Sequence, residues 1–150
     1  MQYFFDTSAL VKYYHPERGT PVVASLLSTP GRKVRISSLG LVELQSAFAI
    51  KVRSGVLPPD EANKLRARLL QDVASGLIEV YKVTSQHISD AETLNARYSY
   101  VWRLRTLDAI QLAVALDLAS RHLVDQFVAA DSVLAEVATL ESLLVLNPEL

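Results

Sequence analysis

Four acidic residues of this sequence have the type and the placement needed for a shared catalytic site. Asp6 and Asp131 each follow a short apolar segment, whereas Glu43 and Asp108 each lie near the start of a helix-like segment. Grouped carboxylates repel one another, and at least one pKa rises unless a cation is bound among them. Such a cation can activate water, orient a phosphodiester and stabilise the leaving oxygen. The four acids therefore predict metal-dependent phosphodiester hydrolysis.

Asp108 is the most informative of the four. It lies in the first turn of the segment TLDAIQLAVALDLA, which is apolar nearly all round and is therefore expected to be buried. A charge in such a helix is costly unless it is paired or bound to a metal. The alternative is that Asp108 stands at position N2 and only complements the helix dipole, with Thr106 as the N-cap.

Asp117 is an internal comparison on the same helix. It follows Asp108 by nine positions, and at about 100° per residue the two side chains point to opposite sides. Arg121 comes four residues later, which is the spacing of a surface ion pair. We therefore expect Asp117 to be structural.

The other three acids also have simpler explanations. Asp6 and Asp131 could be helix caps or turn formers. Glu43 lies one turn into the segment LGLVELQSAF, beyond the capping-box position of a helix capped by Ser38. Its alternative is an exposed glutamate on a polar helix face.

Ligand type narrows the choice of metal. The chain has no cysteine, and its histidines, His15, His87 and His122, lack paired spacing and are expected at the surface. A zinc site would therefore lack its usual ligands. All-oxygen ligation selects hard ions, so the predicted cofactor is Mg²⁺ or Mn²⁺.

Composition limits both the compartment and the way in which nucleic acid could bind. Half of the residues are hydrophobic and none is cysteine, which fits a cytoplasmic protein without disulfides. The sequence shows neither a signal peptide nor an apolar run long enough for a membrane span. Because the formal charge is −1, contacts with nucleic acid must be local. The candidate basic clusters are Arg32-Lys33-Arg35, Lys51 with Arg53, Lys64 with Arg66 and Arg68, and Arg103 with Arg105.

Apolar segments and helix breakers predict alternating strands and helices. Strands are expected at Gln2–Phe5, Lys33–Ser37, Leu77–Val83, Gln126–Ala129 and Leu143–Leu146. The helices expected between them start at Thr7 or Ser8, Val22, Ser37 or Ser38, Pro59, Thr84, Thr106 and Asp131. This alternation favours one α/β domain over residues 1–150 with a mainly parallel sheet. Ligands of such sheets bind outside the carboxyl ends of the strands, which Asp6 and Asp131 follow.

The chain also resembles the PIN-domain nucleases, especially the toxin ribonucleases of type II toxin–antitoxin pairs. The matching segments are FFDTSALVKYY, SSLGLVELQSAF, LRTLDAIQLAVAL, FVAADSVLAEVA and LLVLNP, which occur in the family's order and span nearly the whole chain. The resemblance implies a three-layer α/β/α sandwich around a sheet of about five strands. It places Asp6, Glu43, Asp108 and Asp131 on the family's acidic quartet.

The same resemblance suggests roles and partners. Asp6 and Asp108 would contact the metal directly, Glu43 and Asp131 would complete the pocket, and Thr7 or Ser8 would orient the first acid by a hydrogen bond. A Mg²⁺- or Mn²⁺-dependent endoribonuclease of this kind is expected to act on RNA, to form a homodimer and to bind an antitoxin that covers the acidic groove. Candidates for that covered surface are Tyr13, Tyr14, Tyr98, Tyr100 and Trp102.

Two positions depart from the family pattern. Ala129 stands where members often have Ser or Thr, so a hydroxyl near Asp131 is missing, and Thr139 stands where glycine is common. Ala129 favours one alternative, a non-catalytic PIN-like module that binds RNA or protein, although the presence of all four acids argues against it. An Asp-nucleophile phosphatase would need a second Asp at position 8, which is Ser8. A receiver domain would need acidic neighbours that the sequence lacks.

Overall fold

Short apolar segments form the strands of one sheet. The computed structural model describes residues 1–150, and its five strands are all parallel, in the order β3-β2-β1-β4-β5. Their bounds are β1 Gln2–Phe5, β2 Lys33–Ser37, β3 Glu79–Tyr81, β4 Gln126–Val128 and β5 Val145–Leu146. The predicted parallel sheet of about five strands is confirmed. Its third and fifth strands are shorter than predicted because pairing with the neighbouring strand covers only part of each apolar segment.

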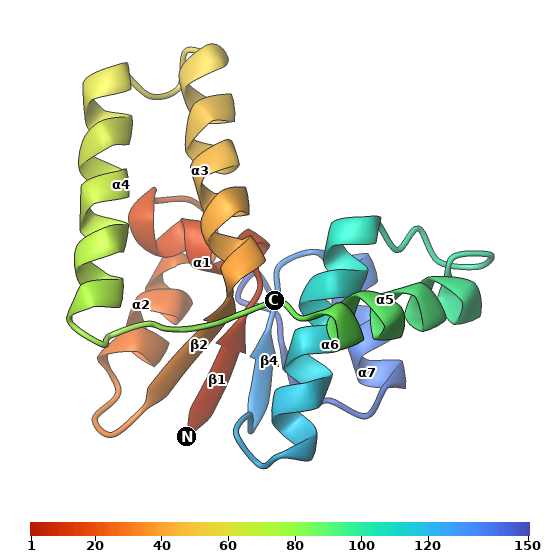
Figure 1. Ribbon diagram of the computed structural model, residues 1–150. Coiled ribbons are helices and arrows are strands. Elements are labelled where there is room, and N and C mark those ends of the chain that lie inside the picture. Colours follow the sequence, from red (N-terminus) through yellow and green to blue (C-terminus); the bar gives the residue numbers. More distant parts are fainter.

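Seven helices cover the two faces of this sheet (Figure 1). The first four lie on one face and the last three on the other, which confirms the three-layer α/β/α arrangement. Their bounds are α1 Thr7–Tyr14, α2 Thr20–Ser28, α3 Ser38–Arg53, α4 Pro59–Ala74, α5 Ser85–Tyr98, α6 Thr106–Ser120 and α7 Ser132–Leu140. None of them is long and apolar enough to cross a membrane.

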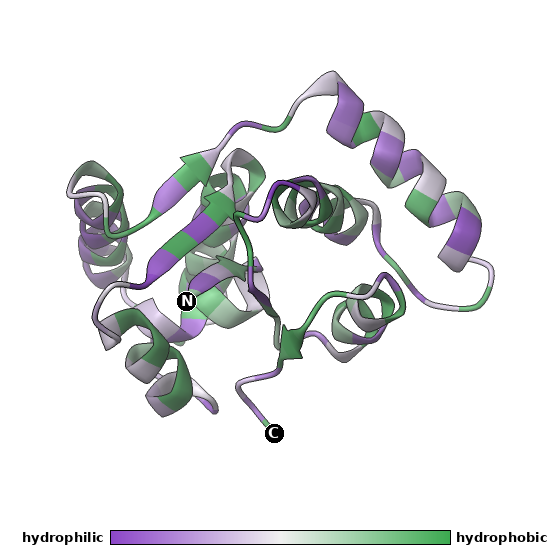
Figure 2. Ribbon diagram, turned by 90° about the horizontal axis from the view of Figure 1, so that it is seen from below, coloured by the Kyte–Doolittle hydropathy of each residue, from purple (hydrophilic) through white to green (hydrophobic).

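Two hydrophobic cores hold the layers together, one on each face of the sheet. Successive side chains of a strand point to opposite faces. Phe4 accordingly packs with α5, α6 and α7, whereas Tyr3 and Phe5 pack with α1 to α4. Hydrophobic and hydrophilic residues alternate along the flanking helices (Figure 2), so that each helix can bury one side against the sheet.

Helix α6 is the exception, because it is buried on most of its surface. Ala109, Leu112, Val114 and Leu118 are all fully buried. The helix lies between the sheet and α5, so only a small part of its surface faces solvent. Its buried polar residues, Asp108 and Gln111, are therefore in an apolar environment, which makes the partners of both important.

The helix caps differ from the prediction in two places. Asp6, not Thr7 or Ser8, is the N-cap of α1, and its Oδ2 accepts a hydrogen bond of 2.9 Å from the Ser8 N–H. Arg105, not Thr106, is the N-cap residue of α6, which puts Asp108 at position N3 rather than N2. Asp131 caps α7 through the N–H of Leu134. The simple capping role foreseen for Asp6 and Asp131 is therefore real in both cases.

The strand order reverses at β1, which makes the β1–β4 pair the switch point of the sheet. From β1 the chain builds outward to β2 and β3, then returns to place β4 and β5 on the other side. The connections after β1 and β4 leave the same edge in opposite directions, and a crevice opens there. Asp6 and Asp131 are the first residues beyond this edge that carry a carboxylate.

Candidate active site

The loops that follow β1 and β4 are joined to each other by hydrogen bonds. The Asp6 N–H donates to the carbonyl of Val128 at 2.9 Å. The Ser8 hydroxyl accepts from the backbone N–H groups of Ala130 and Asp131, at 3.0 and 3.2 Å. Ser8, from α1, thus holds the loop that carries Asp131, at a place where residue 129 has no hydroxyl.

A cavity of about 460 Å³ opens beside this edge, and we call it the acidic cavity. Three of the four predicted acids line it, namely Asp6, Glu43 and Asp108, together with one basic residue, Arg105. The other lining residues are Thr7, Ser8, Leu39, Val42, Ser46, Ala47, Ile50 and Leu107. Asp131 is outside the lining but is connected to the cavity through Arg105.

Glu43 is held by neutral side chains. Its Oε2 accepts hydrogen bonds from the Thr7 hydroxyl at 2.9 Å and from the Gln111 amide at 2.6 Å. Gln111 is 0% exposed, and its Oε1 accepts from the Ser37 hydroxyl at 2.5 Å. Ser37 is in turn the N-cap of α3, the helix that carries Glu43. The orientation of Glu43 is thus fixed by a buried chain that runs from α6 to the start of α3, and Glu43 is not a free glutamate on a polar face.

Asp108 and Asp131 are held by an arginine instead. Arg105 donates to both oxygens of Asp108, at 2.8 and 3.3 Å, and to Asp131 Oδ2 at 3.1 Å. The Asp108 side chain is only 10% exposed, whereas that of Arg105 is 61% exposed. Nearby acids raise the pKa of Arg105 further, Asp108 first and then Asp131 and Asp6. The burial predicted for Asp108 is therefore confirmed, and its charge is compensated.

Asp6 has no positive partner within ion-pair distance. Burial raises the pKa of its carboxyl to about 6, the charges of Asp108 and Glu43 also raise it, and hydrogen bonds from Ser8 lower it. At neutral pH its carboxylate therefore carries a charge in a site that disfavours it. A bound cation would relieve this cost.

The donor types in the acidic cavity suit a hard divalent cation, because Asp6, Glu43 and Asp108 offer only carboxylate oxygens. Their arrangement is less suited. No group of three or more His, Asp or Glu side chains lies close enough together to hold a metal ion. Glu43 is turned toward Thr7 and Gln111, and Asp108 toward Arg105. The chemistry of the donor set fits a metal, while the side-chain positions leave the carboxylates apart.

Asp117 lies away from these residues, as predicted. It pairs with Arg121 at 3.2 Å and approaches Nε2 of His87 at 3.4 Å. The prediction for His87 was wrong, because His87 is buried. Its ring accepts a hydrogen bond from the N–H of Thr84, which completes the N-terminal capping box of α5 and holds the ring close to the backbone.

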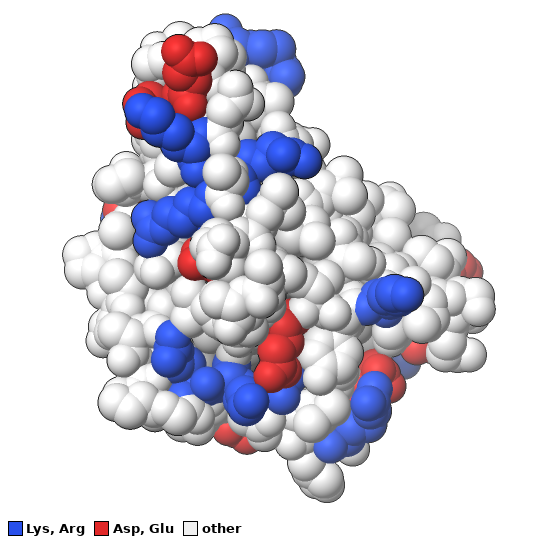
Figure 3. Space-filling view, turned by 60° about the vertical axis from the view of Figure 1, so that its left-hand side comes forward, with Lys and Arg blue, Asp and Glu red and all other residues white.

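The other predicted surface features are only partly available. Among the aromatic candidates, Tyr14 is buried and hydrogen-bonded to Asp72, whereas Tyr100 is 93% exposed. Lys and Arg side chains gather toward the α3–α4 end of the molecule, with acidic side chains among them (Figure 3). Lys51 and Lys64 are already paired there with Glu17 and Glu61.

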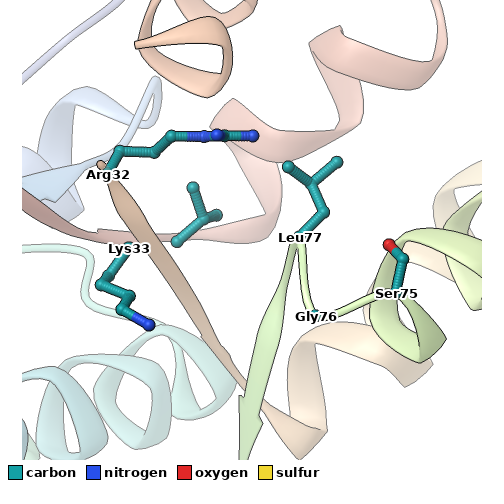
Figure 4. Close-up of a pocket in the computed structure, with 6 residues that line it drawn as sticks. Arg32, Lys33, Ser75, Gly76 and Leu77 are labelled. Carbon is teal, nitrogen blue, oxygen red and sulfur yellow. The ribbon is translucent and has the colours of Figure 1, made fainter. Parts of the chain in front are cut away.

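A second cavity, of about 310 Å³, lies at the opposite edge of the sheet. Figure 4 shows it between the start of β2, with Arg32 and Lys33, and the start of β3, with Ser75, Gly76 and Leu77. It is lined by no carboxylate, and it lies at the amino ends of the strands. Ligands of parallel sheets bind at the carboxyl ends, which favours the acidic cavity as the candidate site.

Two residues of the candidate site were not recognised in the sequence. Arg105 stands out there only as one half of a basic pair, and Gln111 only as a polar residue in an apolar helix. The spacing from Arg105 to Asp108 does predict an ion pair along one helical turn. The same register places Gln111 one turn after Asp108, on the same side of α6.

Comparison with known proteins gives the following matches. A model of the PIN-domain family matches residues 3–140. The fold is similar to that of FitAcB from Neisseria gonorrhoeae, with a TM-score of 0.68, 18% identity and 97% of both chains covered. It is also similar to VapBC2 from Rickettsia felis, solved with a DNA fragment from their promoter, with a TM-score of 0.64, 15% identity and 98% of both chains covered.

A third similar structure is VapC20 from Mycobacterium tuberculosis, a toxin that cleaves the sarcin–ricin loop. Its TM-score is 0.65 at 18% identity, with 89% of this chain and 93% of that chain covered. No curated protein matches the sequence. At these identities the three structures establish a shared fold.

Proposed function

The chain belongs to the PIN-domain family, and on this basis we propose that it is a metal-dependent endoribonuclease, the toxin of a toxin–antitoxin pair. We propose residues 1–150 as one nuclease domain, acting in the cytoplasm with Mg²⁺ or Mn²⁺. The observation that carries the proposal is the acidic cavity, which Asp6, Glu43 and Asp108 line at the switch point of the sheet.

The side chains would divide the work as follows. Asp6 and Asp108 would hold the cation, while Glu43 and Asp131 would complete the pocket. When bound, the cation would supply an activated water and neutralise charge on the scissile phosphate. Ser8 holds the loop of Asp131, and Thr7 and Gln111 orient Glu43, so these residues are positioning residues.

The direct test is cleavage of single-stranded RNA by the purified protein. We expect cleavage in Mg²⁺ or Mn²⁺ and none in EDTA, with recovery when excess Mn²⁺ is added back. Cleavage that continued at full rate in EDTA would exclude the metal mechanism. RNA that remained intact in every metal tested would favour the alternative, a non-catalytic binding module, which is also favoured by Ala129 and by the engaged state of the carboxylates.

Partners follow from the similar structures. FitAB and VapBC2 are solved with DNA, and VapC20 is described as a toxin that cleaves the sarcin–ricin loop. We propose that this chain forms a homodimer and binds an antitoxin whose segment covers the acidic cavity. A small neighbouring gene that encodes a DNA-binding protein, and co-purification of the two products, would support this role. A solitary gene would argue against it.

A further inference from the structure

Arg105 is the one basic residue that lines the acidic cavity. Its guanidinium makes three contacts, two with Asp108 and one with Asp131, and it makes no other side-chain hydrogen bond. These contacts turn two of the four predicted site acids, Asp108 and Asp131, toward an arginine. The cavity thus contains its own positive charge, placed where an added cation would be expected.

The two ends of this ion pair are not equally fixed. The Asp108 side chain is 10% exposed and lies at the start of a buried helix, so its charge needs a partner. The Arg105 side chain is 61% exposed, and an exposed guanidinium leaves an ion pair at little cost because water solvates it well. The carboxylate is therefore the permanent half of the pair, and the arginine is the half that can be exchanged.

The partners of Glu43 differ in this respect. Gln111 is completely buried and bridges Glu43 to Ser37, so it cannot turn outward without breaking its hydrogen bonds to both residues. Both hydrogen-bond partners of Glu43, Gln111 and Thr7, are neutral, so Glu43 has no charged partner that a cation could displace. Exchange of a cation at this site must occur on the side of Arg105.

We propose that Arg105 is a built-in counter-ion of the acidic cavity, which a divalent cation displaces from Asp108 and Asp131, and that the freed guanidinium then binds a phosphate of the RNA. This inference rests on the proposed metal-dependent nuclease function. A released Arg105 would be the only cationic side chain within the cavity, and a guanidinium suits a phosphate because it donates two parallel hydrogen bonds.

Calorimetric titration of Mn²⁺ tests whether the cation displaces Arg105, and it does not require the protein to be active. Arg105→Gln removes the competing charge, so the variant should bind Mn²⁺ about tenfold more tightly than the unchanged protein. The matched control is Arg121→Gln, which removes a similarly exposed arginine from its pair with Asp117 at the other end of α6 and should leave the Mn²⁺ affinity unchanged. Circular dichroism would establish that both variants are folded.

The outcomes separate the two proposals. If Arg105→Gln bound Mn²⁺ as tightly as the unchanged protein or more weakly, the counter-ion role of Arg105 would be wrong, while the nuclease proposal would stand. Failure of all three proteins to bind Mn²⁺ would overturn both. As a second measurement, the Nε–H signal of Arg105 in an NMR spectrum should shift when Mg²⁺ is added, and a signal that stayed in place at saturating Mg²⁺ would also contradict displacement.

The contact between the freed Arg105 guanidinium and an RNA phosphate is tested by the binding of fluorescein-labelled oligouridine in Ca²⁺, measured by anisotropy. Arg105→Gln should bind this RNA about tenfold more weakly than the unchanged protein, although it binds metal more tightly. Arg121→Gln should bind the RNA as the unchanged protein does. Tighter metal binding with unaltered RNA binding would retain the counter-ion and exclude the phosphate contact.

Discussion

On the α3 side of the acidic cavity, Glu43 is held by buried neutral groups, whereas on the α6–α7 side Asp108 and Asp131 share an exposed arginine. The first arrangement fixes a carboxylate without cancelling its charge, because the amide and hydroxyl groups that hold it carry no net charge. The second cancels charge but fixes little. The cavity thus has a fixed carboxylate, Glu43, on one side and, on the other, two carboxylates whose arginine a metal cation could replace.

The largest expected effect concerns activity and would sharpen this comparison. Asp108→Asn should reduce RNA cleavage by about a thousandfold or more, because a direct ligand contributes several kcal/mol to stabilising charge in the transition state. Glu43→Gln, on the rigid side, should cost about tenfold to a hundredfold, since an amide retains the shape of the glutamate. Initial rates at saturating Mn²⁺ measure both. A greater loss in Glu43→Gln would reverse the roles assigned to the two sides.

The rigid side should dominate stability. Gln111→Ala leaves Ser37 and Glu43 without their buried partner and opens a cavity, so the free energy of unfolding should fall by about 3 kcal/mol. The matched control is Gln45→Ala, on an exposed position of α3, with a change below about 0.5 kcal/mol. Urea unfolding gives both values. Similar results for the two glutamines would show that the buried chain does not hold Glu43 in place.

Asp6 belongs to neither side, and its charge is uncompensated. Since its pKa rises from 3.8 to about 6 on folding, the folded protein binds an extra proton between these values and loses stability as the pH rises through that window. Asp6→Asn should therefore raise the free energy of unfolding by about 2 kcal/mol at pH 7.5 in EDTA, and by almost nothing below pH 4. Asparagine retains the N-cap of α1.

Asp108→Asn provides the contrast in the same buffer. Because Arg105 already compensates Asp108, this variant should gain no stability and should lose about 1 kcal/mol. Urea unfolding at several pH values measures both variants. Equal stabilisation of the two would mean that Arg105 does not neutralise Asp108 in solution.

The smallest effect is expected at Asp117, far from both sides of the cavity. Its pair with Arg121 is exposed, so Asp117→Asn should lose no more than about 0.5 kcal/mol of stability and no Mn²⁺ affinity. Thermal unfolding and calorimetry are the measurements. A loss of Mn²⁺ affinity comparable to that of Asp108→Asn would place Asp117 in the site and contradict the helix register.

Strands, helices and the position of the carboxylates follow closely from local patterns. The bounds of β1 and β2 and the starts of α1 and α6 could be predicted because apolar periodicity and helix-start signals act over a few positions. The placement of Asp6 and Asp131 at one edge follows from the rule for parallel strands. Short edge strands such as β5 could not be delimited, because pairing with a neighbour decides where they end.

The sequence by itself determined which residues are acidic, which helix is buried, and that Asp117 would face away from Asp108. Only the tertiary structure decided the long-range partners of Glu43 and Asp131. Gln111 meets Glu43 across 68 positions of sequence and Arg105 meets Asp131 across 26, and no local pattern encodes such contacts. The physical reason is that a buried polar group must be satisfied by whatever donor the fold brings within reach, and that donor is set by the packing of α3, α6 and α7 against the sheet.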